Sequence, residues 1–370
     1  MKTKNDSVLT LIPEEGLNLV QYSGKELLEK LGNDIISNVV LGVLSGENLR
    51  SLTEGLTQRR ILLMNASAFV THLRSLKTFD NFEKDINKII SSELESGGRR
   101  LKNDEKTYLY WMLGLTKKGI ENVTRGSEGI SEYLDLMETN LSGISKEVAS
   151  LYGDIDIEIH SGSDSDISMN WPTLLRCFLT MSAQTLTIRG SEKSVYGKLF
   201  EKFVLGSALT IMGADYINRN DTSRDRMVFW LSSNDKRESD ATLLIRPGYG
   251  ISFDIGFIGR GNPEIVMDKL TRFESRMERG GRRNLMSTIV LIDTLGENST
   301  ATRIAYEMGA HIIQMSDSYW IHELAHVIKE EHPTFDHPLL SMTKEQSIPY
   351  LAETIKKVDL SAFLSAIELD

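Results

Sequence analysis

Apolar residues recur at helical spacing through most of the first 150 residues. They form short groups separated by polar stretches, at residues 27–28, 35–36, 39–41, 61–63 and 108–115. Ser23 followed by Glu26 is typical of a capping box ahead of the first group. Gly97 and Gly98 indicate a break between two helices. The pattern therefore predicts a mainly helical N-terminal region.

The pattern changes at residues 154–160, where apolar and polar residues alternate strictly. Alternation predicts a strand that carries Asp154, Asp156 and Glu158 on one face. These acids could hold a metal ion. A solvated strand face is the simpler interpretation, because no lysine or histidine constellation accompanies them apart from His160.

Strands and helices alternate after residue 190. The predicted elements are a helix over 194–214, strands over 227–231, 240–246 and 251–258, a helix from 262, a strand over 288–292, a helix over 299–308, a strand over 311–315 and a helix over 318–331. The continuous apolar run at 288–292 is typical of a strand that is covered on both faces. This order predicts an α/β fold with a mixed sheet and helices on both of its faces.

The length of 370 residues fits one large or two ordinary domains. We place a boundary close to the alternating segment, which divides the chain into residues 1–165 and 166–370. Apolar residues make up 40% of the chain and prolines number 7, which is typical of a folded globular protein.

Several classes of protein are excluded by what the sequence lacks. No apolar run approaches the roughly 20 residues that span a bilayer, so no membrane partner is expected. The first residues have no apolar core of the kind found in secretory signals. The single cysteine, Cys177, excludes an intrachain disulfide framework and a cysteine-rich zinc site, and we expect it in the core. We therefore expect a cytoplasmic protein.

The main candidate chemistry lies on the two strands around the turn at Pro247 and Gly248. The first strand opens with Asp240, and the second carries Asp254. The turn brings the strands together, so both carboxylates can lie at one edge of the hairpin. Two neighbouring carboxylates are costly unless a cation lies between them, and hard oxygen ligands favour Mg²⁺. The pair therefore predicts a magnesium site of the kind that serves phosphodiester hydrolysis.

Two further residues could belong to this site. Glu201 interrupts the apolar stripe of the helix over 194–214, where a carboxylate is costly without a partner. A nuclease core of the restriction type also carries an acid-x-Lys pattern, but the position two residues after Asp254 is Gly256. Lys269 is the nearest lysine in the following sequence that could supply the missing amino group.

The formal net charge of −10 argues against non-specific coating of DNA but allows a local basic patch. Such a patch lies at residues 272–283, where arginines outnumber glutamates. These arginines either form a solvated face or contact phosphates. Likewise, Asn262-Pro-Glu264 is either a plain helix cap or part of a DNA contact. The candidates for DNA contact are Arg260, Asn262, Arg272 and Arg276.

The segment from Ile251 to Ile265, together with Asp268-Lys269-Leu-Thr-Arg-Phe273, resembles the central block of type II restriction endonucleases of the CfrBI type. These enzymes are similar to the wider PD-(D/E)XK nuclease superfamily. The resemblance covers about residues 190–330, and the N-terminal half matches nothing. It implies a restriction-endonuclease-like mixed β-sheet flanked by helices, with a PD-(D/E)XK-like nuclease domain in residues 166–370.

The resemblance also implies roles for particular residues. Asp240 and Asp254 become catalytic metal ligands, Glu201 the acid on the preceding helix, and Lys269 the displaced lysine. The implied activity is Mg²⁺-dependent, site-specific hydrolysis of double-stranded DNA that leaves 5′-phosphate ends. A palindromic site implies a homodimer, and a restriction-modification system implies a cognate DNA methyltransferase. Residues 1–165 would then serve DNA recognition or dimerisation.

Two other functions stay open. His322-Glu-Leu-Ala-His326 matches the His-Glu-x-x-His pattern of zinc metalloproteases, and His332 stands where some of them place a third ligand. The glycine that those enzymes need seven positions after the first histidine is Lys329 here. In a nuclease this helix would only cover the sheet, through Leu324 and Ile328. The missing acid-x-Lys lysine instead favours a catalytically inactive DNA-binding module.

Overall fold

The computed structural model describes residues 7–21, 24–123, 129–160, 166–217, 227–232, 239–257, 286–296, 300–307 and 309–366. The chain forms two compact units. Unit 1 comprises Met1–Tyr22 and Leu56–Glu192, and unit 2 comprises Ser23–Gly55 and Lys193–Asp370. A functional boundary near residue 165 stays a prediction.

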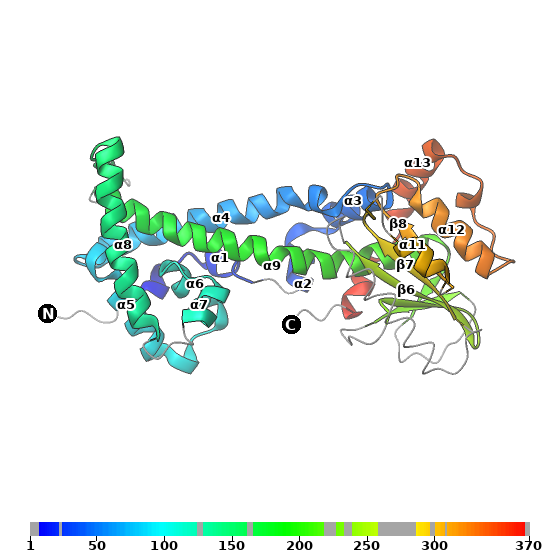
Figure 1. Cartoon of the computed structure of the whole chain (residues 1–370), viewed down its shortest axis with the longest axis horizontal. Coiled ribbons are helices and arrows are strands. Elements are labelled where there is room, and N and C mark those ends of the chain that lie inside the picture. Colours follow the sequence, from blue (N-terminus) through cyan, green and yellow to red (C-terminus); the bar gives the residue numbers. More distant parts are fainter. Residues whose placement is uncertain are drawn as a thin grey trace. The chain divides into compact units, whose positions relative to one another are not determined.

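Unit 1 is mainly helical, as the apolar spacing predicts (Figure 1). Its helices and 3-10 turns are η1 (Val8–Leu11), α1 (Glu14–Leu17), α4 (Leu49–Thr78), α5 (Phe82–Gly97), η2 (Gly98–Arg100), α6 (Asn103–Met112), α7 (Lys117–Val123), α8 (Gly129–Tyr152) and α9 (Trp171–Ile211). Helices α4 and α9 contribute residues to both units. The break predicted at the two glycines is confirmed, because α5 ends at Gly97.

A short antiparallel pair of strands, β1 (Ile157–Ile159) and β2 (Ile167–Met169), also belongs to unit 1. The strand predicted over 154–160 is therefore shorter than expected, because its partner offers only three residues for pairing. Asp154, Asp156 and Glu158 of the predicted strand are exposed, as a solvated strand face requires.

Large aromatic residues form the core of unit 1, where Tyr108 and Trp111 pack with Met64 and Phe82. The Tyr108 hydroxyl lies 3.0 Å from the Ser67 hydroxyl, so the buried polar atom has a partner. Cys177 is buried, as predicted, and burial raises the pKa of its thiol to about 12. Its thiolate is therefore scarce at neutral pH, which makes Cys177 a packing residue.

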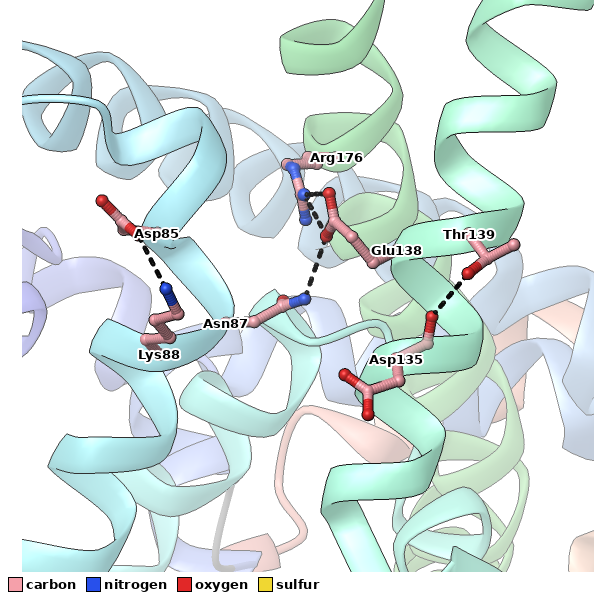
Figure 2. A network of polar contacts seen from close by, with 7 residues as sticks. All are labelled: Asp85, Asn87, Lys88, Asp135, Glu138, Thr139 and Arg176. Atoms are coloured by element: carbon pink, nitrogen blue, oxygen red, sulfur yellow. Dashed lines mark hydrogen bonds and ion pairs between the residues drawn. The ribbon is translucent and has the colours of Figure 1, made fainter.

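A buried arginine is neutralised in unit 1 by a network that joins three helices (Figure 2). The Arg176 guanidinium on α9 donates to both carboxylate oxygens of Glu138 on α8, at 2.8 and 2.5 Å. The Asn87 amide on α5 donates to the same carboxylate at 3.2 Å. The Arg176 side chain is 8% exposed and that of Glu138 is 51% exposed. Glu138 therefore compensates a charge that water reaches poorly.

Within the described residues, unit 2 contains a six-stranded sheet in the order β3-β4-β5-β6-β7-β8. Strands β6, β7 and β8 of this sheet are labelled in Figure 1. The strands are β3 (Asp215–Tyr216), β4 (Val228–Leu231), β5 (Ala241–Arg246), β6 (Tyr249–Gly256), β7 (Met286–Ile292) and β8 (Ala310–Gln314). The pairs β4–β5 and β5–β6 are antiparallel, and the other neighbouring pairs are parallel. The predicted mixed sheet is confirmed.

The helices of unit 2, beside its part of α9, are α2 (Gly24–Leu31), α3 (Asn33–Leu44), α11 (Ala301–Glu307), α12 (Trp320–Glu331) and α13 (Lys344–Ile355), with the 3-10 turns η3 (Pro338–Leu340) and η4 (Leu360–Ala366). Helix α11 packs against Val290 and Ile292 on one face of β7. Ile289 and Leu291 on the opposite face are also buried. The prediction of a strand covered on both faces is confirmed.

Two elements differ from the sequence-based prediction. The helix expected over 194–214 is the C-terminal part of α9, which begins at Trp171. Gly190 and Gly197 do not end it, because a glycine inside a helix costs only about 1 kcal/mol. Strand β3 carries no periodic signal, since it is two residues long. The helix expected from residue 262 lies outside the described residues.

Residues 23–55 belong to unit 2 through contacts with distant parts of the sequence. The Trp320 indole donates to the Val43 carbonyl at 2.8 Å. The Asn48 amide donates to the Asp293 carboxylate at 2.7 Å, at the end of β7. None of the helices in the described part of the chain has the length and apolar character needed to cross a membrane.

Replacing Glu138 with alanine should lower the free energy of unfolding by about 1–3 kcal/mol. The change leaves the Arg176 guanidinium without its carboxylate, but half-exposed Glu138 is partly screened by water, so the loss falls below that of a fully buried pair. Lys88→Ala is the matched control. It removes an exposed pair with Asp85 and should change stability by less than about 0.5 kcal/mol. Urea unfolding of the full chain measures both, and equal losses would contradict the role given to Glu138.

A second prediction concerns His72, whose imidazole lies 3.0 Å from the Thr180 hydroxyl in the core of unit 1. Burial, aided by the charge of Arg176, lowers the pKa of His72 to about 4. In the unfolded chain the pKa of His72 is the ordinary 6.5. Between pH 6.5 and pH 4 the unfolded chain therefore binds a proton at His72 that the folded chain does not. Stability should therefore fall as the pH drops from 6.5 towards 4, by about 3 kcal/mol at most from this residue.

The readout for His72 is the pH dependence of the free energy of unfolding in the wild type and in His72→Gln. Other acids also titrate at low pH, so the difference between the two slopes isolates His72. Parallel slopes would show that His72 does not contribute.

Candidate active site

The hairpin formed by β5 and β6 carries the two aspartates that the sequence singles out. Arg246 pairs with Tyr249, so Pro247 and Gly248 form the turn that the sequence predicts. Gly248 has a φ of +80°, a conformation that favours glycine. At Gly250 a Cβ atom would lie 2.4 Å from the Leu243 carbonyl oxygen. Both glycines therefore help to fix the register of the hairpin.

This register brings the two aspartates to the same end of the hairpin. Ala241 pairs with Phe253 as the last pair of the antiparallel ladder, so Asp240 and Asp254 are the next residues beyond that pair. Asp254 is 3% exposed, whereas the Asp240 side chain is 25% exposed. This end of the hairpin thus carries one buried and one more accessible carboxylate.

The Asp240 carboxylate is oriented by the neighbouring strand. The backbone N–H of Ile255 donates to Asp240 Oδ2 at 2.8 Å. The Asp240 carbonyl accepts from the backbone N–H of Ser232 at 3.0 Å, which holds its backbone to the end of β4. Asp240 is therefore fixed on both sides although it precedes the first residue of β5.

Lys202 lies beside Asp240, and the sequence analysis did not select it. Its Nζ donates to the Asp240 carbonyl at 3.2 Å and lies 4.0 Å from Asp240 Oδ1. The Lys202 side chain is 12% exposed, and the next residues of α9, Phe203 and Val204, are fully buried. A lysine in such a helix segment needs a nearby acceptor. That surrounding apolar sequence was the signal that could have identified it.

Glu201 precedes Lys202 on α9. The apolar stripe that Glu201 was predicted to interrupt on this helix is confirmed, since Leu205, Ala208 and Met212 are buried. Adjacent residues of a helix point about 100° apart, so Glu201 and Lys202 do not project in the same direction. Glu201 is only half-buried, and its role in the site stays a prediction.

Polar side chains continue along the same face of the sheet. The Ser252 hydroxyl lies 2.7 Å from that of Thr288 on β7, and both residues are buried. Ser252 and Asp254 are two residues apart on β6, so they share a face. This face therefore carries a buried carboxylate next to a hydrogen-bonded hydroxyl pair.

The donor set of the hairpin fits magnesium better than zinc. Mg²⁺ prefers oxygen ligands and usually binds through one or two carboxylates while keeping several waters. Asp240 and Asp254 supply such a pair. Among the residues that the structure describes, no three His, Cys, Asp or Glu side chains gather as a fuller metal cage. Asp240 and Asp254 are the residues that would hold a metal ion here, and that role stays a prediction.

Comparison with known proteins identifies the family. The family described as CfrBI restriction endonuclease matches residues 33–300. The type II restriction enzyme CfrBI of Citrobacter freundii is 33% identical over 354 residues, which are 95% of this chain and 97% of that enzyme. The chain belongs to the CfrBI restriction endonuclease family. No solved structure matches it.

Membership makes the chain a type II restriction endonuclease of the CfrBI family, as the resemblance implied. The similarity is more extensive than the expected residues 190–330. The family match begins at residue 33, so the N-terminal half, which the sequence analysis matched to nothing, belongs to the family as well. The helical region is thus a shared part of these endonucleases.

Several predicted residues of this CfrBI-family endonuclease lie outside the described residues, so their roles stay predictions. They are Lys269 and the candidates for DNA contact, Arg260, Asn262, Arg272 and Arg276.

The His-Glu-x-x-His pattern lies on α12. Leu324 and Ile328 are buried, as predicted for a helix that covers the sheet. The His332 ring, the possible third ligand, lies 3.3 Å from the Thr334 hydroxyl. In the described part of the chain no third zinc-binding side chain joins His322 and His326. The family and this geometry therefore favour the endonuclease over the metalloprotease.

Proposed function

We propose that this restriction endonuclease hydrolyses double-stranded DNA with Mg²⁺ as cofactor, and that Asp240 and Asp254 hold the metal ion. The proposal is supported by the β5–β6 hairpin, where Asp240 and Asp254 are the next residues beyond the last pair of the ladder and the Ile255 N–H donates to Asp240 Oδ2. The products would carry 5′-phosphate ends. When bound, Mg²⁺ would polarise the scissile phosphate and lower the pKa of a bound water.

The chain's own residues prepare this site before any substrate binds. Asp254 is buried, so its carboxylate is costly unless cations or hydrogen-bond donors compensate it. Asp240 is oriented by the Ile255 N–H, which removes the need to arrange its carboxylate during the reaction. One aspartate thus faces the interior and the other meets solvent, where a DNA phosphate can approach.

Lys202 is the described residue that best replaces the lysine missing from the acid-x-Lys pattern. Gly256 has no side chain, and the Lys202 ammonium lies 4.0 Å from Asp240 Oδ1. A cation at this position would counter the negative charge that develops on the phosphate and would help to orient the attacking water. The sequence-based candidate for the same role is Lys269.

The partners follow from the substrate. A palindromic duplex site has one scissile bond on each strand, so a homodimer would present one active site to each. Residues 1–165 would contribute to dimerisation or DNA recognition, and Arg260, Asn262, Arg272 and Arg276 would contact DNA. A cognate DNA methyltransferase would protect the host sites from cleavage.

Asp254→Asn should lower the rate of DNA cleavage in Mg²⁺ by at least roughly 100-fold, the scale of losing one electrostatic catalytic element. The amide keeps the shape of the side chain but removes the charge that holds the metal ion. Asp293→Asn is the matched control, because Asp293 is also a buried aspartate but lies at the end of the adjacent strand β7. Phage DNA is incubated with each protein, and discrete bands are followed on a gel. Cleavage by Asp254→Asn at the wild-type rate would refute the metal site. A wild-type protein that binds DNA without cutting would instead favour the inactive DNA-binding module.

Replacement of Lys202 with methionine tests the lysine. Methionine keeps an unbranched side chain in a buried helix and removes the charge, so the fold should persist while cleavage falls by roughly 100-fold or more. Lys269→Met is made in parallel. Single-turnover cleavage and DNA binding are measured for both variants. A loss confined to Lys269→Met would assign the role to Lys269 and contradict our choice of Lys202.

A further inference from the structure

Two histidines of α12, His322 and His326, lie with their Nε2 atoms in contact. His322 Nε2 and His326 Nε2 are 3.2 Å apart, and the ring centroids are 4.3 Å apart. The spacing of four residues places both side chains on one side of the helix. The proposed endonuclease mechanism uses neither residue.

The separation of the two nitrogens matches that of two ligands on one metal ion. Zinc–imidazole bonds of roughly 2.0–2.1 Å at the tetrahedral angle place the two nitrogens roughly 3.3 Å apart. The observed 3.2 Å therefore allows both Nε2 atoms to bind the same ion without a change in the helix. A hydrogen bond between two neutral imidazoles is the alternative explanation for this distance.

Neighbouring groups position the His322 ring before any ion binds. The Tyr319 ring stacks on it at a centroid distance of 4.2 Å and an interplanar angle of 16°. Tyr319 is itself tied down by a hydrogen bond from its hydroxyl to the Met342 carbonyl.

We propose that His322 and His326 form a site for a transition-metal ion such as Zn²⁺, with water completing the coordination. Imidazole ligands suit zinc, nickel and copper, whereas Mg²⁺ prefers oxygen. The site would therefore take a different ion from the aspartate pair. Within the described residues only these two histidines come together here, so the site binds metal without the three protein ligands of a catalytic zinc centre.

The test is equilibrium dialysis of the full chain against zinc chloride in buffer that contains excess Mg²⁺. The expected result is stoichiometric zinc, with binding weakened by at least roughly tenfold in His322→Ala and in His326→Ala, since even the loss of a group that only supports a ligand costs that much. His332→Ala is the matched control, because this histidine follows the same helix and contacts Thr334 instead. It should retain binding. His326→Gln serves as a second variant should the alanine protein fail to fold.

Three results would overturn the proposal. They are the absence of zinc binding by the wild type, unchanged binding in both His326 variants, and loss of binding in Asp254→Asn. The last result would place the zinc at the aspartate pair. Because dialysis does not depend on cleavage, a failure of the proposed nuclease site leaves this measurement interpretable.

Discussion

The candidate active site depends on the burial of one carboxylate in the middle of a sheet. Asp254 lies on β6 between the antiparallel strand β5 and the parallel strand β7, and it is 3% exposed. An isolated carboxylate in such a place would become protonated instead of staying charged. The groups near this carboxylate therefore decide whether it can stay charged and bind a metal ion. Asp240 is held beside the residue that follows Asp254 by the Ile255 N–H, and Lys202 contacts Asp240.

Register is the device that assembles these groups. A slip of one residue between β5 and β6 would move every side chain of one strand to the other face and separate the aspartates. The turn glycine at Gly248 and the close approach at Gly250 both oppose such a slip. The contact from Lys202 then depends on how α9 lies against the end of β5. The position of the site residues thus depends both on the local turn and on one long-range contact.

The features predicted correctly from the sequence have local signals. The hairpin follows from Pro247 and Gly248, and the doubly covered strand β7 follows from its apolar run. The inclusion of residues 23–55 in unit 2 has no such signal, because it depends on Trp320 and Asp293, which lie hundreds of residues away. Lys202 has a local signal in the apolar residues that follow it on α9, but that signal does not identify its partner Asp240, which is 38 residues further along the chain.

The histidine pair on α12 shows which part of a zinc site a short sequence motif can predict. Spacing of four residues on a helix is enough to bring two imidazoles to 3.2 Å, because the helix itself fixes that geometry. A third ligand must come from outside the helix, through a turn that the spacing does not encode. Here Lys329 stands in place of the glycine, α12 continues through it to Glu331, and the His332 ring lies beside the Thr334 hydroxyl. Helical periodicity therefore explains a two-nitrogen site, while a protease would require tertiary structure that this chain does not show among its described residues.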